Sequence, residues 1–100
     1  MWLRLGRLTG FRVAGNSMKP TLADGDIVLL SPSKEFRTGD IVLARHPFKQ
    51  SVKILKRIES IMSNGNYFLA GDDPAESTDS RSFGAIHAKD IIGKVVCLLK

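Results

Sequence analysis

The stretch Val52-Lys53-Ile54-Leu55-Lys56-Arg57-Ile58 lies in the longest predicted strand of the chain, which spans residues 51–61. Because side chains alternate between the two faces of a strand, one face carries Val52, Ile54, Lys56 and Ile58. A single lysine therefore stands among apolar neighbours. Removal from water lowers the pKa of a lysine, and a neutral lysine can take a proton from a serine hydroxyl. The alternative is that Lys56 extends from an edge strand into solvent, as most such lysines do.

A second stretch, Gly15-Asn16-Ser17-Met18-Lys19-Pro20-Thr21-Leu22, places a serine in a turn before a short apolar strand. Gly15 permits a positive φ and a close approach of the backbone to a ligand, and Pro20 fixes its own φ. Both residues favour a rigid, exposed turn for Ser17, as a nucleophile requires. Ser17 and Lys56 are thus a candidate nucleophile and general base. The alternative is a plain turn with a capping serine.

The remaining pattern predicts a mostly β chain with at most short helical turns. The predicted strands cover residues 26–31, 41–45, 51–61, 67–70 and 91–99, and segment 11–14 leads into the serine turn. Asn64-Gly65 is a strong hairpin signal. Residues 71–81 are predicted as a polar loop and 88–90 as one helical turn. Strands at short, even spacing favour a small antiparallel barrel or coiled sheet. We expect one domain, residues 1–100.

The bulk properties exclude little. The net charge of +5 permits an acidic partner, an anionic membrane surface or nucleic acid. The one cysteine, Cys97, lies in an apolar run and is expected to be a buried small hydrophobe. No apolar run approaches the roughly 18–20 residues that span a bilayer. Residues 1–8 lack the apolar centre of a signal peptide, although a short basic segment of this kind permits peripheral membrane contact. We expect a cytoplasmic location, with membrane association as the alternative.

Three blocks of the chain, in order, resemble the signal peptidase I family of serine proteases, which use a Ser/Lys dyad. The blocks are residues 15–26, Lys56-Arg57 at the end of an apolar strand, and the segment from Gly71-Asp72-Asp73 through Ser77-Thr78-Asp79-Ser80-Arg81-Ser82-Phe83-Gly84 to residues 91–94. Together they span nearly the whole chain. The resemblance implies a small antiparallel β fold of the signal-peptidase catalytic-core type. It also implies an extended substrate paired along a strand edge, with small residues just before the cut.

The resemblance assigns roles to individual residues. It implies that Ser17 is the nucleophile and an oxyanion donor through its backbone N–H, and that Lys56 is the general base. Ser77 is implied to orient the lysine, and Asp79 and Arg81 to form a salt bridge that braces the site. Gly15, Met18 and Pro20 are expected to support the site structurally. Gly15 also occupies the position at which some signal peptidases carry an oxyanion serine, so a second oxyanion donor must come from elsewhere.

No cofactor is expected, and no metal. The carboxylates of residues 72–79 do not have the spacing of a known calcium loop, and no Cys/His cluster suggests zinc. The implied activity is an endopeptidase that removes an N-terminal leader from a precursor protein. The short chain and the lack of an anchor resemble the maturation proteases of nickel-type superoxide dismutase. The alternative is a signal peptidase that processes exported preproteins at the membrane. Self-cleaving SOS-type repressors resemble only the first two blocks.

The sequence leaves two other functional interpretations open. A Ser-His-Asp triad would combine Ser17 and His46 with Asp26 or Asp40, but the serine turn lacks the Gly-x-Ser-x-Gly elbow. A non-enzymatic basic β-barrel would bind single-stranded nucleic acid by stacking bases on aromatic rings. Its candidate aromatics are Phe11, Phe36, Phe48, Tyr67, Phe68 and Phe83. Binding to phosphate has no need of a lone lysine on an apolar strand face, so no nucleic-acid partner is expected.

Overall fold

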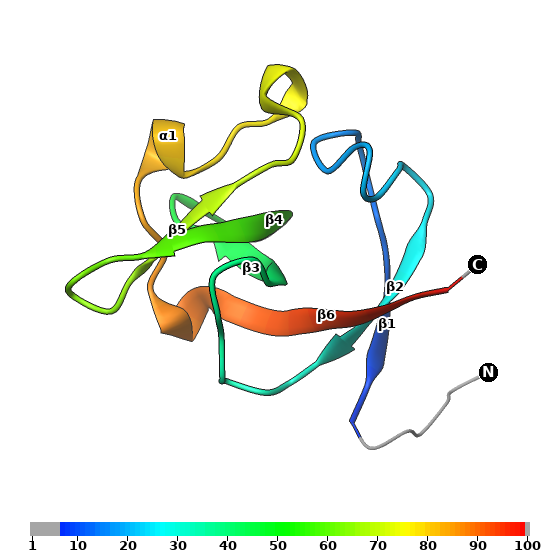
Figure 1. Ribbon diagram of the computed structural model, residues 1–100, viewed down its shortest axis with the longest axis horizontal. Helices are drawn as coiled ribbons and strands as arrows, with labels where there is room; N and C mark the ends of the chain where they lie inside the picture. Colours follow the sequence, from blue (N-terminus) through cyan, green and yellow to red (C-terminus); the bar gives the residue numbers. More distant parts are fainter. Residues whose placement is uncertain (1–6, 100) are drawn as a thin grey trace.

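The computed structural model describes residues 7–99, which form one antiparallel sheet and three short helical segments (Figure 1). The strands are β1 (Thr9–Arg12), β2 (Ile27–Ser31), β3 (Ile41–His46), β4 (Lys49–Ile61), β5 (Tyr67–Ala70) and β6 (Ile91–Leu99). The helical segments are η1 (Pro74–Glu76), α1 (Ser80–Phe83) and η2 (Ala88–Asp90). The fold is mostly β with only short helical turns, as predicted. Segment 1–8 of the sequence analysis lies mostly outside the described residues.

The spatial order of the strands is β1-β2-β6-β3-β4-β5. The last strand therefore lies inside the sheet. Its second half, from Lys94 to Leu99, pairs with β2, and its first half, from Ile91 to Lys94, pairs with β3. Strands β1 and β5 form the two edges, so the sheet is open rather than a closed barrel. The long strand β6 thus joins a β1-β2 half of the sheet to a β3-β4-β5 half.

Local sequence signals account for most element boundaries. Gly65 has φ 87°, which suits the Asn64-Gly65 turn between β4 and β5. The predicted polar loop 71–81 contains more structure than expected. The Asp73 side chain caps η1 by accepting from the Ala75 N–H, and the Asp79 side chain caps α1 by accepting from the Arg81 N–H. Two aspartates thus turn a polar loop into two short helical segments.

Two hydrophobic clusters lie on opposite faces of the β3-β4 pair, because both strands alternate apolar side chains to both sides. The first cluster contains Val13, Met18, Leu22, Val28, Leu30, Leu43 and Leu55. The second contains Phe36, Val42, Ala44, Ile58, Leu69, Ile86 and Ile91. Lys56 is the cross-strand partner of Val42, which is fully buried in the second cluster. Lys56 therefore extends toward the side of the sheet that carries the second cluster.

The expectation that Cys97 is buried is wrong, because its side chain is exposed. Cys97 pairs with Leu29, and Leu29 lies between Val28 and Leu30, which point into the first cluster. The alternation of β2 therefore turns Cys97 to the outer face of the sheet. Within residues 7–99, no helix has the length and apolar character needed to cross a membrane.

Candidate functional site

The Ser17 turn is anchored to the hydrophobic core by its neighbour Met18, which is 1% exposed and belongs to the first cluster. The Leu22 N–H donates to the Met18 carbonyl at 2.9 Å, and the Gly15 N–H donates to the Asp24 carboxylate at 2.7 Å. Gly15 has φ 84°, a conformation that favours glycine. Pro20 lies exposed in the same turn. The turn thus holds Ser17, half-buried, at a fixed position above the core.

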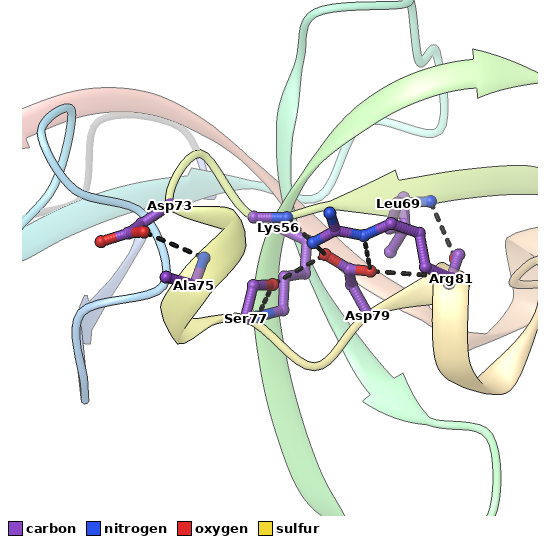
Figure 2. A network of polar contacts seen from close by, with 9 residues as sticks. Lys56, Leu69, Asp73, Ala75, Ser77, Asp79 and Arg81 are labelled. Carbon is purple, nitrogen blue, oxygen red and sulfur yellow. Dashed lines mark hydrogen bonds and ion pairs between the residues drawn. The ribbon is translucent and has the colours of Figure 1, made fainter.

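Lys56 is 5% exposed, so the alternative in which it extends into solvent is wrong. Its Nζ donates to the Ser77 Oγ at 3.0 Å (Figure 2). Burial lowers the pKa of Lys56 below its usual 10.5. The negative charge of Asp79 opposes this shift of the Lys56 pKa, whereas the positive charge of Arg81 adds to it. The environment of Lys56 therefore makes the neutral amine, which is the form that accepts a proton, more accessible than it is in an exposed lysine.

Asp79 lies behind Ser77 and is 1% exposed. It accepts from the Ser77 hydroxyl at 2.7 Å, from the Gly71 N–H at 2.9 Å and from Arg81 through Nε at 2.9 Å and Nη2 at 2.8 Å. Burial acts to raise the pKa of Asp79, but the hydrogen bonds from Arg81, Gly71 and Ser77 outweigh it and hold that pKa well below the usual range. Asp79 is therefore an ionised acceptor that fixes the Ser77 hydroxyl.

The Lys56, Ser77, Asp79 and Arg81 side chains form one connected chain of polar contacts (Figure 2). Gly71 allows this chain to lie close to the serine turn. A Cβ at Gly71 would collide with the Ser77 Oγ and would lie 2.7 Å from the Ser17 carbonyl oxygen. The same carbonyl accepts from the Asp73 N–H at 2.8 Å. The loop that carries Ser77 is thereby attached directly to the backbone of Ser17.

Ser17 and Lys56 line the same cavity, which has a volume of about 380 Å³. Its other lining residues are Ala14, Gly15, Asn16, His46, Lys49, Val52, Ile54, Glu76 and Thr78. Within residues 7–99 no hydrogen bond joins the Ser17 and Lys56 side chains, and Lys56 contacts Ser77 instead. The structure thus brings together the three candidate residues Ser17, Lys56 and Ser77, with Asp79 and Arg81 behind them.

A second polar cluster beside the site had no assigned role in the sequence analysis. Arg57 forms two hydrogen bonds to Asp72, from Nε at 2.9 Å and from Nη2 at 2.7 Å, and its Nη1 donates to the Gly39 carbonyl. Thr21, in the serine turn, donates its hydroxyl to the same Asp72 carboxylate at 2.6 Å. The hydrogen bonds from Arg57 lower the pKa of Asp72. We call Arg57, Asp72 and Thr21 the clamp.

The sequence contained a signal for the clamp. Arg57 directly follows Lys56, and Asp72 follows Gly71, so both lie within the blocks that resemble signal peptidases. The partner of each charge was nevertheless not evident from spacing. In the fold, the clamp joins the serine turn to β4 and to the loop after β5, beside the elements that hold Ser17 and Lys56.

The Ser-His-Asp alternative is not assembled in the fold. His46 lines the cavity, but its Nδ1 accepts from the Phe48 N–H at 3.1 Å, and its ring packs on Phe83. The Asp26 and Asp40 carboxylates accept from the backbone of their own turns. No carboxylate therefore orients the His46 ring among residues 7–99. The same part of the chain contains no group of three His, Cys, Asp or Glu side chains placed to hold a metal ion.

The aromatic side chains of the nucleic-acid alternative are mostly used for packing. Phe36 is buried, Phe68 is half-buried, and Phe11, Tyr67 and Phe83 pack against the two clusters. Phe48 is 76% exposed, at the hairpin between β3 and β4. These residues do not provide a row of exposed rings on which bases could stack.

The geometry places a half-buried hydroxyl and a buried amine with a lowered pKa around one cavity, with a second, fixed hydroxyl that accepts a hydrogen bond from the amine. A family model described as Peptidase S24-like matches residues 2–96. The chain is 32% identical over 108 residues to mitochondrial inner membrane protease subunit 1 of Xenopus tropicalis, covering 85% of this chain and 64% of that relative. It is 24% identical over 111 residues to mitochondrial inner membrane protease subunit 2 of Schizosaccharomyces pombe, covering 87% and 62%.

The chain is also 32% identical over 98 residues to LexA repressor 1 of Nocardia farcinica, covering 95% of this chain and 40% of the relative. It thus spans less than two thirds of the length of each of these three proteins. The family match covers nearly the whole chain and includes the serine turn, the lysine strand and the loop that joins them. The chain therefore belongs to the Peptidase S24-like family.

Proposed function

We propose that this chain is the catalytic part of a serine endopeptidase that removes an N-terminal leader from a precursor protein. The observation that carries the proposal is the position of Lys56. It is buried, its pKa is lowered by burial, and it lines the same cavity as Ser17. A lysine in this state can act as a general base at a pH where an exposed lysine is fully protonated.

In the proposed reaction, neutral Lys56 takes the proton of the Ser17 hydroxyl, and the Ser17 oxygen attacks the scissile carbonyl. The resulting ammonium gives its proton to the leaving amine, so the peptide bond breaks and an acyl-enzyme remains. Lys56 then takes a proton from water as the water oxygen attacks the acyl carbon; the bond to the Ser17 oxygen breaks, the acid leaves, and Lys56 returns the proton to Ser17. The Ser17 backbone N–H is the proposed donor to the oxyanion. Ser77 fixes the amine of Lys56 and is itself fixed by Asp79.

The proposed substrate lies extended beside β4. Residues Arg57 to Ile61 of β4 pair with β5, whereas the cavity-lining half of β4 pairs with β3 alone among the described residues. An extended leader can add there as a further strand. The sequence resemblance suggests the precursor of a nickel-type superoxide dismutase, processed in the cytoplasm. Relatives named for the mitochondrial inner membrane favour a precursor presented at a membrane instead.

The test is cleavage of leader-bearing precursors by purified protein. One arm uses a nickel-type superoxide dismutase precursor, and the other uses a signal-peptide precursor with phospholipid vesicles. Ser17→Ala and Lys56→Ala are each expected to lower kcat by at least about a hundredfold. Lys53→Ala is the matched control, because Lys53 is an exposed lysine on the other face of the same strand. Cleavage that survives in folded Ser17→Ala would refute the proposal.

A further inference from the structure

The cavity that holds Ser17 and Lys56 has charged groups at two separate places. Glu76 lines the cavity and directly precedes Ser77, whose hydroxyl contacts Lys56, so we assign Glu76 to the reactive end. Lys49 and His46 line the cavity from the hairpin between β3 and β4. Lys49 pairs with His46 and Lys56 pairs with Val42, four positions apart in β3, which corresponds to roughly 13 Å at about 3.3 Å per residue, because the pairing of β4 is irregular between Lys49 and Lys53. The cavity therefore has a carboxylate near the reactive Lys56 and basic side chains at the far end.

These charges are available to a ligand. Lys49 and Glu76 are both exposed, and within residues 7–99 neither side chain takes part in an ion pair. The His46 Nδ1 accepts from the Phe48 N–H, so in the neutral ring the proton lies on Nε2, which remains a free donor. Packing against Phe83 at a centroid distance of 4.8 Å holds this ring in place. The far end thus offers two donors and the reactive end one acceptor.

The wall between the two ends is apolar. Val52 and Ile54 line it from β4, and Ala14 lines it from the segment before the serine turn. Because successive side chains of a strand alternate, Val52, Ile54 and Lys56 face the cavity, whereas Lys53 falls on the other face. An extended peptide beside β4 rises by nearly the same distance per residue as β4 itself. Like β3, which covers the same span between His46 and Val42, such a peptide has its residue opposite Lys49 about four positions from the residue opposite Lys56.

We propose that this cavity selects leaders that lie parallel to β4 by a charge pattern: a basic side chain beside the scissile bond, next to Glu76, and an acidic side chain about four residues earlier, next to Lys49 and His46. The inference rests on the proposed function, since it assigns the charges to parts of a cleaved leader. Each contact is between partly solvated charges, so each changes affinity by only about two- to fivefold. Their main effect is to fix the direction and register of the leader.

The test uses three fluorescent peptides that share one leader sequence. The first has the proposed pattern, the second has the two charges exchanged, and the third has glutamine at both positions. Affinities are measured by fluorescence anisotropy on Ser17→Ala, and kcat/KM is measured on the wild-type chain. The first peptide is expected to bind most tightly and the second most weakly. The variant K49E/E76K is expected to reverse this order.

The control is K53E/E35K, which exchanges the same two charges outside the cavity and leaves the net charge unchanged. It is expected to keep the wild-type order. Equal affinities for the three peptides, absent binding, or the same reversal in both double variants would each overturn the inference. If Ser17→Ala binds in the expected order but wild type cleaves no peptide, the catalytic proposal fails and the charge pattern stands. If wild type cleaves all three peptides equally, the catalytic proposal stands and the charge pattern fails.

Discussion

At the scale of single residues, the site depends on two buried groups whose charges are opposed. Burial lowers the pKa of Lys56, whereas burial of Asp79 is outweighed by hydrogen bonds that keep this carboxylate ionised. The two groups contact each other only through the Ser77 hydroxyl, which accepts from Lys56 and donates to Asp79. This arrangement keeps a negative charge near the amine without a direct ion pair, which would stabilise the protonated form.

The first prediction concerns the pH dependence of cleavage. The base must be unprotonated, so the rate should rise as the pH increases through the pKa of Lys56, below the usual 10.5. Asp79 raises that pKa and Arg81 lowers it. Asp79→Asn should therefore move the rising limb to lower pH, and Arg81→Gln should move it to higher pH. The measurement is kcat/KM against pH for the three chains.

Opposite shifts are the distinguishing result. General damage to the site would lower the rate without shifting the rising limbs of the two variants' pH profiles in opposite directions. Circular dichroism checks that both variants fold, which matters most for Asp79→Asn, since Asp79 is buried with several donors. Shifts in the same direction would contradict the proposed role of Lys56 as the titrating base.

At the scale of elements, the sequence predicted five of the six strands, all except β1, but not how the strands combine. Period-two alternation and turn residues are local signals, so β4, the Asn64-Gly65 turn and β5 were predicted closely. The internal position of β6 depends on pairings with β2 and β3, which local patterns do not specify. The exposure of Cys97 follows from the same pairings and was therefore predicted wrongly.

For the candidate site, too, local sequence patterns identified single residues but not the contacts between distant ones. Alternation in one strand was enough to identify Lys56 as unusual. The grouping of Ser77, Asp79 and Arg81 came from the resemblance to signal peptidases, not from the pattern of residues. The clamp was missed because it joins Thr21 to Asp72 and Arg57, which lie 51 and 36 positions further along the chain. Long-range polar contacts of this kind are decided by the fold.

The second prediction tests whether the clamp positions the serine turn. Thr21→Val removes the hydroxyl that donates to Asp72 and keeps the shape of the side chain. Because this hydrogen bond is exposed to solvent, its loss should lower the free energy of unfolding by only about 0.5–1.5 kcal/mol. If the clamp positions Ser17 relative to Lys56, kcat should fall severalfold while KM changes little. Steady-state kinetics and chemical denaturation give the two values.

Thr38→Val serves as the comparison, since Thr38 is an exposed threonine in a turn away from the cavity. Arg57→Lys adds a second check. It keeps the positive charge but removes the paired hydrogen bonds of the guanidinium, so it should also lower kcat. A Thr21→Val chain that loses stability but retains full kcat would limit the clamp to a structural role.

At the scale of the whole molecule, the two hydrophobic clusters share strands β3 and β4. Leu43 and Leu55 contribute to the first cluster, and Val42 and Ile58 contribute to the second from the same two strands. The candidate site is supported by both hydrophobic clusters. The serine turn is anchored in the first cluster through Met18, and Lys56 extends on the side of the second. Loss of either cluster should therefore separate the nucleophile from its base.

The third prediction is that residues 7–99 unfold as one cooperative unit, as a single domain requires. Ile58→Val removes one methylene from the second cluster, where Ile58 is 1% exposed, and should cost about 0.5–1.5 kcal/mol. Because β3 and β4 belong to both clusters, this cost should appear equally in amides of both halves. The measurement is hydrogen exchange of the Val28 amide in β2 and the Leu69 amide in β5. Protection should fall by the same factor at the two amides, whereas a loss confined to Leu69 would mean that the β3-β4-β5 half opens independently and that the site can come apart without global unfolding.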